Sequence, residues 1–171
     1  YTDGLSFDAD DSGENGYFVN FMSYPNETAV VICGKRIDTW SEETGGIYST
    51  AADSEKADVL IDENKFIKKA RYPNDSYLKS KANTASENSN EMFVDEKIPE
   101  MNNICEAEVY VWPNNSFRNE TAKIVGAAGG KITLNKGFDW SQGEVNRFYY
   151  RNDSAFLDIP GEFSYDGVKL L

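Results

Sequence analysis

The sequence predicts an all-β fold, and three observations support that prediction. Short runs rich in β-branched and aromatic residues recur along the 171 residues, and such residues favour strands. Pairs such as Gly45-Gly46, Gly129-Gly130 and Pro160-Gly161 separate the runs and supply turn residues. No segment keeps the apolar period of an amphipathic helix. The predicted strands cover residues 17–24, 29–33, 57–61, 66–71, 106–112, 121–125, 131–134 and 147–150.

The first two predicted strands, residues 17–24 and 29–33, are rich in aromatic and aliphatic residues. Pro25 and Asn26 between them predict a turn, because proline presets the first turn position and asparagine tolerates positive φ. Residues 38–46 then change the composition to polar, acidic and glycine-rich. We therefore expect a domain border there, and we expect the first two strands to pack apart from the main core.

Residues 106–112 carry the clearest strand pattern. Small or aliphatic residues at 107, 109 and 111 alternate with polar or aromatic residues, and a period of two places the apolar side chains on one face of a strand. The later strands repeat this apolar content. The predicted core of the main domain consists of Val109, Val111, Ile132, Leu134, Phe148 and Leu157.

Two other segments, residues 79–91 and 168–171, carry separate expectations. Residues 79–91 are polar and rich in asparagine and serine, which predicts a mobile loop between strands. Residues 168–171 form an apolar, strand-like ending, so the parent chain is expected to continue beyond Leu171 and to leave this strand edge unpaired here.

The composition excludes several classes of function. The chain has no histidine, which is the side chain that exchanges protons near neutral pH without a shifted pKa, so catalytic triads and metal sites built on histidine are excluded. Its 17 basic and 29 acidic residues give a formal charge of −12, which would repel the phosphates of nucleic acids and anionic membranes. A neutral or cationic partner is expected instead. No run approaches the roughly 20 apolar residues of a membrane span.

The sequence assigns no catalytic residue and no metal ligand. Acid–base hydrolysis of a glycosidic bond needs two carboxyl groups roughly 5 to 10 Å apart. The 29 acidic residues provide no means of choosing such a pair. The chain by itself is therefore expected to catalyse no reaction, and no cofactor is expected.

One acidic segment resembles the start of a calcium-binding loop. Asp8, Asp10 and Ser12 stand at alternating positions, and Gly13 occupies the sixth position. The twelfth position is Val19, so the bidentate carboxylate that completes such a loop is missing. An acidic turn is the favoured interpretation, and a calcium ion near Asp8, Asp10 and Ser12 is the alternative.

Cys33 and Cys105 are expected to be buried free thiols, with a single disulfide as the alternative, because the chain lacks a cysteine-rich framework. Neither cysteine identifies the compartment. Asparagine-x-serine/threonine triplets begin at Asn26, Asn74, Asn114, Asn119 and Asn152. A chain this rich in asparagine produces such triplets by chance, so they receive little weight.

Six residues are candidates for carbohydrate binding. Trp112, Tyr72 and Trp40 could stack on the flat faces of pyranose rings, although packing in a core or at a domain interface is the favoured interpretation of each of them. Lys68, Lys69 and Arg71 belong to a basic run that could hold a uronate or a sulfate group. A solvated strand face is the favoured interpretation of that run, and the overall charge favours neutral glycans.

The order of several short motifs resembles that of a known family. Residues 11–14 and 17–21 are followed by residues 24–35, and Ala70-Arg71-Tyr72-Pro73-Asn74 comes after them. Residues 107–113, 146–150 and 156–163 complete the order over nearly the whole chain. This order is similar to the first part of secreted right-handed parallel β-helix proteins of the pectate-lyase-like superfamily, which includes many glycoside hydrolases. Cys33 and the segment Phe163-Ser164-Tyr165 depart from the family pattern.

The resemblance implies a division of the chain. Residues 1–40 would form an N-terminal β-helix coil, residues 41–163 an inserted antiparallel β-sandwich or barrel-like domain, and residues 164–171 a return strand toward the β-helix. The expected fold is thus the start of a right-handed parallel β-helix with an inserted all-β domain. In this family the catalytic acids lie on later coils, so no catalytic residue is carried over to this chain.

The resemblance also implies a function. The chain would be the N-terminal, non-catalytic portion of a secreted or cell-surface, polysaccharide-active enzyme whose expected activity is glycoside hydrolysis. The inserted domain would be a structural flank or a wall of the substrate cleft. Its expected partners are a polysaccharide or oligosaccharide and the downstream β-helix of the same parent chain. The alternative is a self-standing carbohydrate-binding module or a surface adhesin module.

Overall fold

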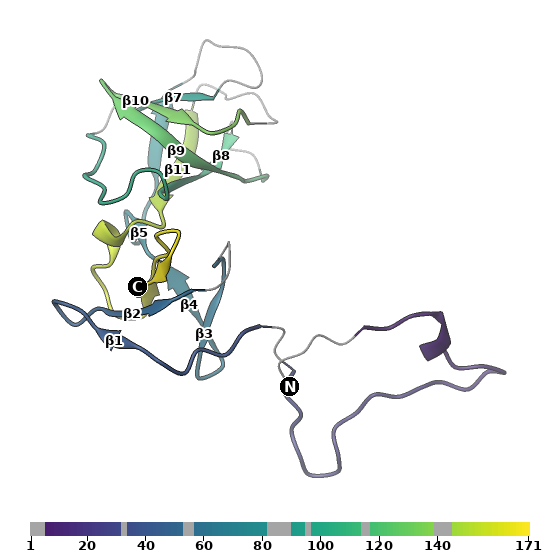
Figure 1. Cartoon of the computed structure of the whole chain (residues 1–171). Helices are drawn as coiled ribbons and strands as arrows, with labels where there is room; N and C mark the ends of the chain where they lie inside the picture. Colours follow the sequence, from purple (N-terminus) through teal and green to yellow (C-terminus); the bar gives the residue numbers. More distant parts are fainter. Residues whose placement is uncertain are drawn as a thin grey trace. The chain divides into compact units, whose positions relative to one another are not determined.

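The computed structural model describes residues 6–31, 34–52, 57–81, 90–94, 97–113, 117–138 and 145–171. The chain divides into two compact units, Tyr1–Trp40 and Ser41–Leu171. All strands among the described residues lie in the second unit (Figure 1). The all-β prediction is therefore confirmed.

The first unit contains turns and extended backbone. A 3-10 turn, η1 (Ala9–Asp11), is closed by a capping box in which the Asp8 carboxylate accepts the Asp10 N–H and the Asp11 carboxylate accepts the Asp8 N–H. The predicted turn at Pro25 and Asn26 is present, and the Glu27 N–H donates to the Tyr24 carbonyl at 3.0 Å.

The strands predicted at residues 17–24 and 29–33 were wrong over the residues that the structure describes, and no β-helix coil is seen in this part of the chain. Ile32 and Cys33 lie outside the described residues. Large apolar side chains of this unit are strongly exposed, with Phe18 at 87% and Met22 at 81%. A strand requires a hydrogen-bonding neighbour and a covered face, and a high β-propensity supplies neither.

The main body of the second unit is a closed antiparallel barrel. Its six strands follow the order β6-β7-β10-β9-β8-β11, and β11 closes the ring by pairing with both β6 and β8 (Figure 1). The short strand β5 adds to the free part of β11. The bounds are β5 Arg71–Tyr72, β6 Leu78–Lys81, β7 Glu91–Val94, β8 Glu108–Trp112, β9 Glu120–Ala128, β10 Lys131–Leu134 and β11 Val145–Arg151.

The inward positions of these strands form the barrel core. Every second residue of β8 and β10 is apolar and buried, as the period of two predicts. Five of the six predicted core residues are buried, and Leu157 packs against the core while partly buried: Val109, Val111, Ile132, Leu134 and Phe148 are the buried five. The prediction of the core is therefore confirmed.

The prediction of a loop over residues 79–91 was wrong at both ends. Residues 78–81 and 91–94 form β6 and β7, and residues 82–89 lie outside the described part of the chain. The polar Ser80 points inward in β6 and is buried, where its hydroxyl accepts a hydrogen bond from Asn146 Nδ2 at 3.0 Å. Polar residues at inward positions weaken the sequence signal of a strand, because the barrel satisfies them internally.

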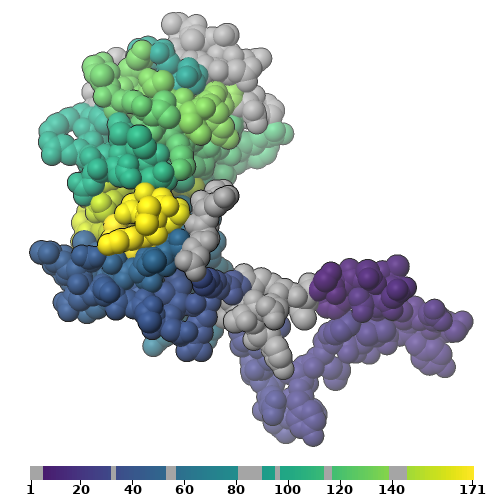
Figure 2. Space-filling view, viewed as in Figure 1, coloured from purple at the N-terminus to yellow at the C-terminus, as the bar shows by residue number. Residues whose placement is uncertain are grey.

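Two small sheets lie beside the barrel in the same unit. One has the order β1-β2-β13, and the other has the order β12-β4-β3. Their bounds are β1 Ser41–Glu42, β2 Tyr48–Ala51, β3 Leu60–Asp62, β4 Lys65–Lys69, β12 Glu162–Phe163 and β13 Lys169–Leu170. The C-terminal segment, yellow in Figure 2, contacts the β1–β2 segment, in agreement with the β13–β2 pairing.

The expectation of an unpaired strand edge at residues 168–171 was wrong. Strand β13 pairs with β2 on one side, and on the other side Ser164 and Leu171 exchange two backbone hydrogen bonds of 3.0 and 2.9 Å. Leu170 is buried. The end of the chain is therefore part of a sheet.

Strands β4 and β12 are parallel neighbours, and the whole barrel lies between them in the sequence. Ala70, directly after β4, connects the small sheet to the barrel. Its N–H donates to the Phe163 carbonyl at 2.7 Å, and its carbonyl accepts the Asn152 N–H at 2.9 Å. Ala70, where the chain enters the barrel, is thus hydrogen-bonded to Asn152 and Phe163, which follow the last barrel strand.

Two buried polar residues organise the exit from β11. Asp153 caps the 3-10 turn η3 (Ser154–Phe156), and its carboxylate also accepts the N–H groups of Asn102 and Asn103, all at 2.8 Å. Asn152, at a positive φ of 63°, bonds through its side chain to the backbone of Glu106 and Tyr165. These contacts join the segment before β8 to the segments after β11.

The first residue of β12, Glu162, carries a carboxyl group whose ionised form is disfavoured. Burial raises the pKa of Glu162 above its ordinary 4.5, and the Asp158 carboxylate raises it further, while backbone N–H groups of Ile159 and Asp158 oppose the rise. An acid with a raised pKa binds its proton more tightly in the folded state. Its stabilising contribution is therefore complete below the unfolded pKa and is lost as the pH rises through the folded pKa.

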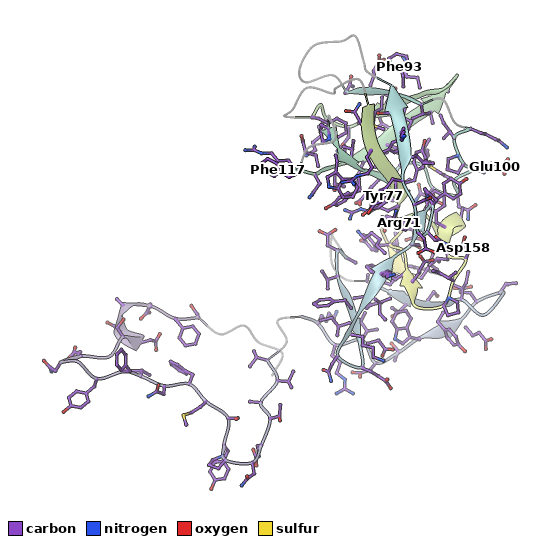
Figure 3. The ribbon with its side chains drawn as sticks, turned by 180° about the vertical axis from the view of Figure 1, so that it is seen from behind. Arg71, Tyr77, Phe93, Glu100, Phe117 and Asp158 are labelled. Carbon is purple, nitrogen blue, oxygen red and sulfur yellow. The ribbon has the colours of Figure 1, made fainter. Side chains whose placement is uncertain are left out.

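We expect Glu162→Gln to raise the midpoint of urea unfolding relative to the wild type at about pH 7, and to change it less at about pH 4. Glutamine keeps an acceptor oxygen for the turn and carries no charge. Glu100→Gln is the matched control, because Glu100 is exposed (Figure 3). A Glu162→Gln shift of equal size at both pH values would contradict the assignment.

Candidate functional site

The structure does not gather the six predicted carbohydrate-binding residues into one site. Trp112 in β8 and Arg71 in β5 contribute to one surface cluster, described below. Tyr72 stacks on Phe156 with ring centroids 6.0 Å apart. Trp40 belongs to the first unit and is exposed.

The two lysine candidates are neighbours on β4, and their side chains point in different directions. Lys68 is exposed, whereas the Lys69 side chain is largely buried. Lys69 Nζ lies 3.2 Å from the Asp58 carboxylate and 3.9 Å from that of Glu108. Because Lys69 is paired with carboxylates on two sides, it serves the packing of β4 against the barrel.

The register of β11 and β8 places aromatic and basic residues side by side on the outer face of the barrel. Arg147 is opposite Trp112, and Tyr149 is opposite Tyr110. The residues between them, such as Phe148, point into the core. Alternation along two paired strands thus builds one outer surface from both.

Four aromatic rings meet on this surface. Tyr110 and Tyr149 stack with centroids 5.1 Å apart and an interplanar angle of 7°. Tyr77, just before β6, meets Trp112 edge-on at 5.2 Å, and Trp112 lies 4.9 Å from Tyr110. Such offset and edge-on pairs are favourable arrangements of aromatic rings. Tyr77 is the most open of the four, with 45% of its surface exposed.

Two arginines complete the arrangement, which we call the arginine–aromatic cluster: Arg71, Tyr77, Tyr110, Trp112, Arg147 and Tyr149. Arg71 Cζ lies 3.7 Å from the ring centroid of Tyr149. Arg147 Cζ lies 4.4 Å from that of Trp112. Both guanidinium groups also approach the Tyr77 ring, at 5.3 and 4.8 Å. Figure 3 shows Arg71 and Tyr77 close together at one end of the barrel.

The arginines differ in how the protein holds them. Arg71 donates from Nε to the Pro73 carbonyl at 2.9 Å and from Nη2 to the Ser76 carbonyl at 2.5 Å, so its position is fixed by the loop after β5. The Nε of Arg147 is buried and meets no hydrogen-bond acceptor among the described residues. Neither arginine forms a salt bridge to a carboxylate in the part of the chain that the structure describes.

The neighbouring charges are paired among themselves. Arg151 Nε donates to the buried Glu108 carboxylate at 2.6 Å, and the Arg151 guanidinium lies 5.1 Å from the Tyr110 ring centroid. Burial raises the pKa of the Tyr149 phenol, although Arg151 and Arg71 oppose the rise. Tyr149 therefore presents a neutral hydroxyl at physiological pH.

A cleft of about 370 Å³ lies beside this surface. Its charged lining is largely paired, since Glu108 bonds to Arg151 and Lys123 bonds to Glu106 at 2.7 Å. The cleft is lined by Asp58, Glu108, Thr121, Ala122, Lys123, Asn135, Lys136 and Arg151. Because most of its charges are paired, the cleft is a weaker candidate site than the arginine–aromatic cluster.

Sequence reasoning missed four members of the cluster: Tyr77, Tyr110, Arg147 and Tyr149. A signal for three of them was present, because Arg147, Tyr149 and Arg151 alternate along one strand and Tyr110 alternates with Val109 and Val111. Which strand faces β11 could not be read from that alternation, so the cluster could not be assembled from it.

Cys105 and the acidic segment at Asp8, which the sequence also singled out, are not members of the cluster. Cys105 is free, as expected, but it is exposed and not buried; Cys33 lies outside the described residues. The oxygens of Asp8 take part in the capping box at η1. Among the described residues, no group of three acidic or cysteine side chains is arranged to hold a metal ion. No helix in the described ranges is long and apolar enough to cross a membrane.

No protein family, curated protein or solved structure matches the chain.

Proposed function

We propose that the barrel is a glycan-binding domain in the N-terminal portion of a secreted or cell-surface, polysaccharide-active protein. The observation that carries this proposal is the arginine–aromatic cluster on the outer face of β8 and β11. It places four aromatic rings within contact distance of one another at a partly open surface. The proposed partner is a polysaccharide or oligosaccharide.

The chemistry of the cluster suits a sugar. A pyranose ring has an apolar C–H face, which packs on an aromatic ring, and a rim of hydroxyl groups, which need hydrogen-bond partners. Tyr77 offers an exposed ring and a hydroxyl, and the guanidinium groups of Arg71 and Arg147 offer donors beside it. Tyrosine and tryptophan lose little conformational entropy on binding, since each has few rotatable bonds.

The parallel pairing of β4 with β12 supports the wider proposal. Antiparallel strands can be joined by a short hairpin, but parallel neighbours need a long crossover connection. Here the connection is the complete barrel, which is the arrangement expected of a domain inserted between two parallel strands of a β-helix. The resemblance to pectate-lyase-like proteins suggests the same arrangement. In this proposal the parent acts on polysaccharides as a glycoside hydrolase, and the barrel holds the polymer.

The proposal is tested by measuring the binding of the full chain to xylan, β-glucan and polygalacturonate by affinity gel electrophoresis and calorimetry. At least one of these polymers should bind. Trp112→Ala and Tyr77→Ala should each weaken that binding about tenfold, equivalent to roughly 1.4 kcal/mol. Urea unfolding of both variants shows whether the fold is retained.

Phe93→Ala is the matched control, because Phe93 is a partly exposed aromatic residue of β7 at the far end of the barrel from Tyr77 (Figure 3). Its loss should leave glycan affinity unchanged. Equal weakening by Phe93→Ala and Trp112→Ala would contradict the assignment of the surface, and no binding to any polymer would overturn the proposed function.

A further inference from the structure

We infer that the arginine–aromatic cluster recognises the carboxylate of an acidic sugar, a uronate, in a bound glycan. This inference rests on the proposed glycan-binding function and adds the chemical class of the ligand. It is carried by the two arginines of the cluster, whose charges the described part of the chain leaves without a carboxylate.

The charge of the chain makes this arrangement unusual. Acidic residues outnumber basic residues by twelve, and two cations with mostly buried side chains near the cluster have carboxylate partners. Arg151 bonds to Glu108, and Lys69 lies between Asp58 and Glu108. Arg71 and Arg147 are also partly buried, yet no ion pair joins either of them to a described acidic residue. A local positive surface therefore stands on an acidic protein.

The rings orient the guanidinium groups for an anion. Aromatic rings attract a guanidinium through its face, as Trp112 does at 4.4 Å from Arg147. This contact leaves the N–H donors at the edge of the guanidinium plane, and those donors match the two oxygens of a carboxylate. Arg147 Nε is itself buried and has no acceptor among the described residues, so a carboxylate would bond to the terminal Nη groups of this side chain.

A further cation reinforces the site. Lys79 in β6 is directly opposite Arg147 in β11 and is exposed. Arg147 and Arg71 both approach the half-exposed Tyr77 ring. A uronate residue can thus place its C–H face on Tyr77 while its carboxylate lies against Arg147. The net charge, which favours neutral glycans, acts at longer range and is screened by salt beyond about 10 Å.

The experiment compares four probes on the full chain by calorimetry: short oligogalacturonates, the same oligomers after methyl esterification, neutral xylo-oligosaccharides, and a sulfated oligosaccharide. We expect oligogalacturonates to bind, and esterification to weaken binding at least about tenfold, because it removes the charge and one acceptor. Arg147→Lys retains the charge but lacks the planar fork, so it should weaken oligogalacturonate binding several-fold. Arg147→Gln should weaken it further.

Lys123→Gln is the matched control, since Lys123 is a barrel cation that is paired with Glu106 outside the cluster. It should leave affinity unchanged, and unfolding midpoints should confirm that each variant folds. Equal affinity for esterified or neutral oligomers would overturn the inference and leave the proposed function in place. Equal affinity for the sulfated probe would overturn the carboxylate specificity. Binding of none of the four would overturn the inference, and absence of binding to xylan, β-glucan and polygalacturonate as well would overturn the proposed function.

Discussion

Asp153→Ala is expected to lower the free energy of unfolding by roughly 3–5 kcal/mol, because three partly buried hydrogen bonds to one buried, charged acceptor are lost at once. The Asp153 side chain is 1% exposed, and its carboxylate accepts from Asn102, Asn103 and Ala155 at 2.8 Å. Water cannot easily replace that acceptor at a buried position. Urea unfolding followed by tryptophan fluorescence and circular dichroism measures the loss.

Two further variants test the cause of this loss. Asp75→Ala removes a carboxylate from an exposed position and should shift the midpoint little. Asp153→Asn keeps one acceptor oxygen, so it should be less destabilising than Asp153→Ala. If Asp153→Ala cost no more than Asp75→Ala, the carboxylate would not be the element that joins residues 102–103 to η3.

The second large effect is expected at the neighbouring residue, where Asn152→Ala should cost roughly 3–4 kcal/mol. Asn152 is 3% exposed, and its Nδ2 donates to the carbonyls of Glu106 and Tyr165, each at 2.9 Å. Its Oδ1 accepts the Tyr165 N–H at 2.9 Å. Alanine loses these bonds and is also strained at a φ of 63°.

A glycine at position 152 distinguishes the contribution of the side-chain hydrogen bonds from that of backbone strain. Asn152→Gly removes the same hydrogen bonds but adopts positive φ freely, so it should be less destabilising than Asn152→Ala by roughly 1 kcal/mol. Thermal and urea unfolding of both variants give the comparison. Identical losses would show that backbone strain contributes nothing, and a loss below that of an exposed Asn26→Ala control would refute the role assigned to the side chain.

The described structure agrees best with prediction where the sequence signal is local. Residues 131–134 were predicted as a strand and form β10, because the short alternating run follows a glycine pair that turns the chain. The apolar side chains of β8 and β11 were assigned to the core correctly, since a period of two identifies the buried face whatever the neighbouring strand is.

The long-range arrangement could not be predicted in the same way. The barrel closes through pairing of β8 with β11, and no local pattern specifies which strand neighbours which. The members of the arginine–aromatic cluster come from β5, β8, β11 and the segment before β6, so its existence depends on that pairing. Trp112 and Arg71 were singled out as separate residues, and only the closed barrel brings them together.

Residues 17–24 were predicted as a strand and do not form one. Their local signal is strong, but within their own unit the described residues supply no neighbouring strand. Residues 78–81 show the reverse case. Their polar sequence gives only a weak strand signal, yet they form β6, because Leu78 and Ser80 face the barrel interior and β11 pairs with the strand. In both segments the availability of pairing partners outweighed β-propensity.

The insertion of the barrel between β4 and β12 has a consequence for the order of folding. Joining the ends of an unstructured loop of roughly 90 residues costs about 4 kcal/mol of chain entropy. Once the barrel has formed, Ala70 and Asn152 are bonded to each other, and the loop that remains before Phe163 is short. We therefore expect the barrel to form first, because the parallel β4–β12 pair joins segments far apart in the unfolded chain and becomes a nearly local contact once the barrel is folded.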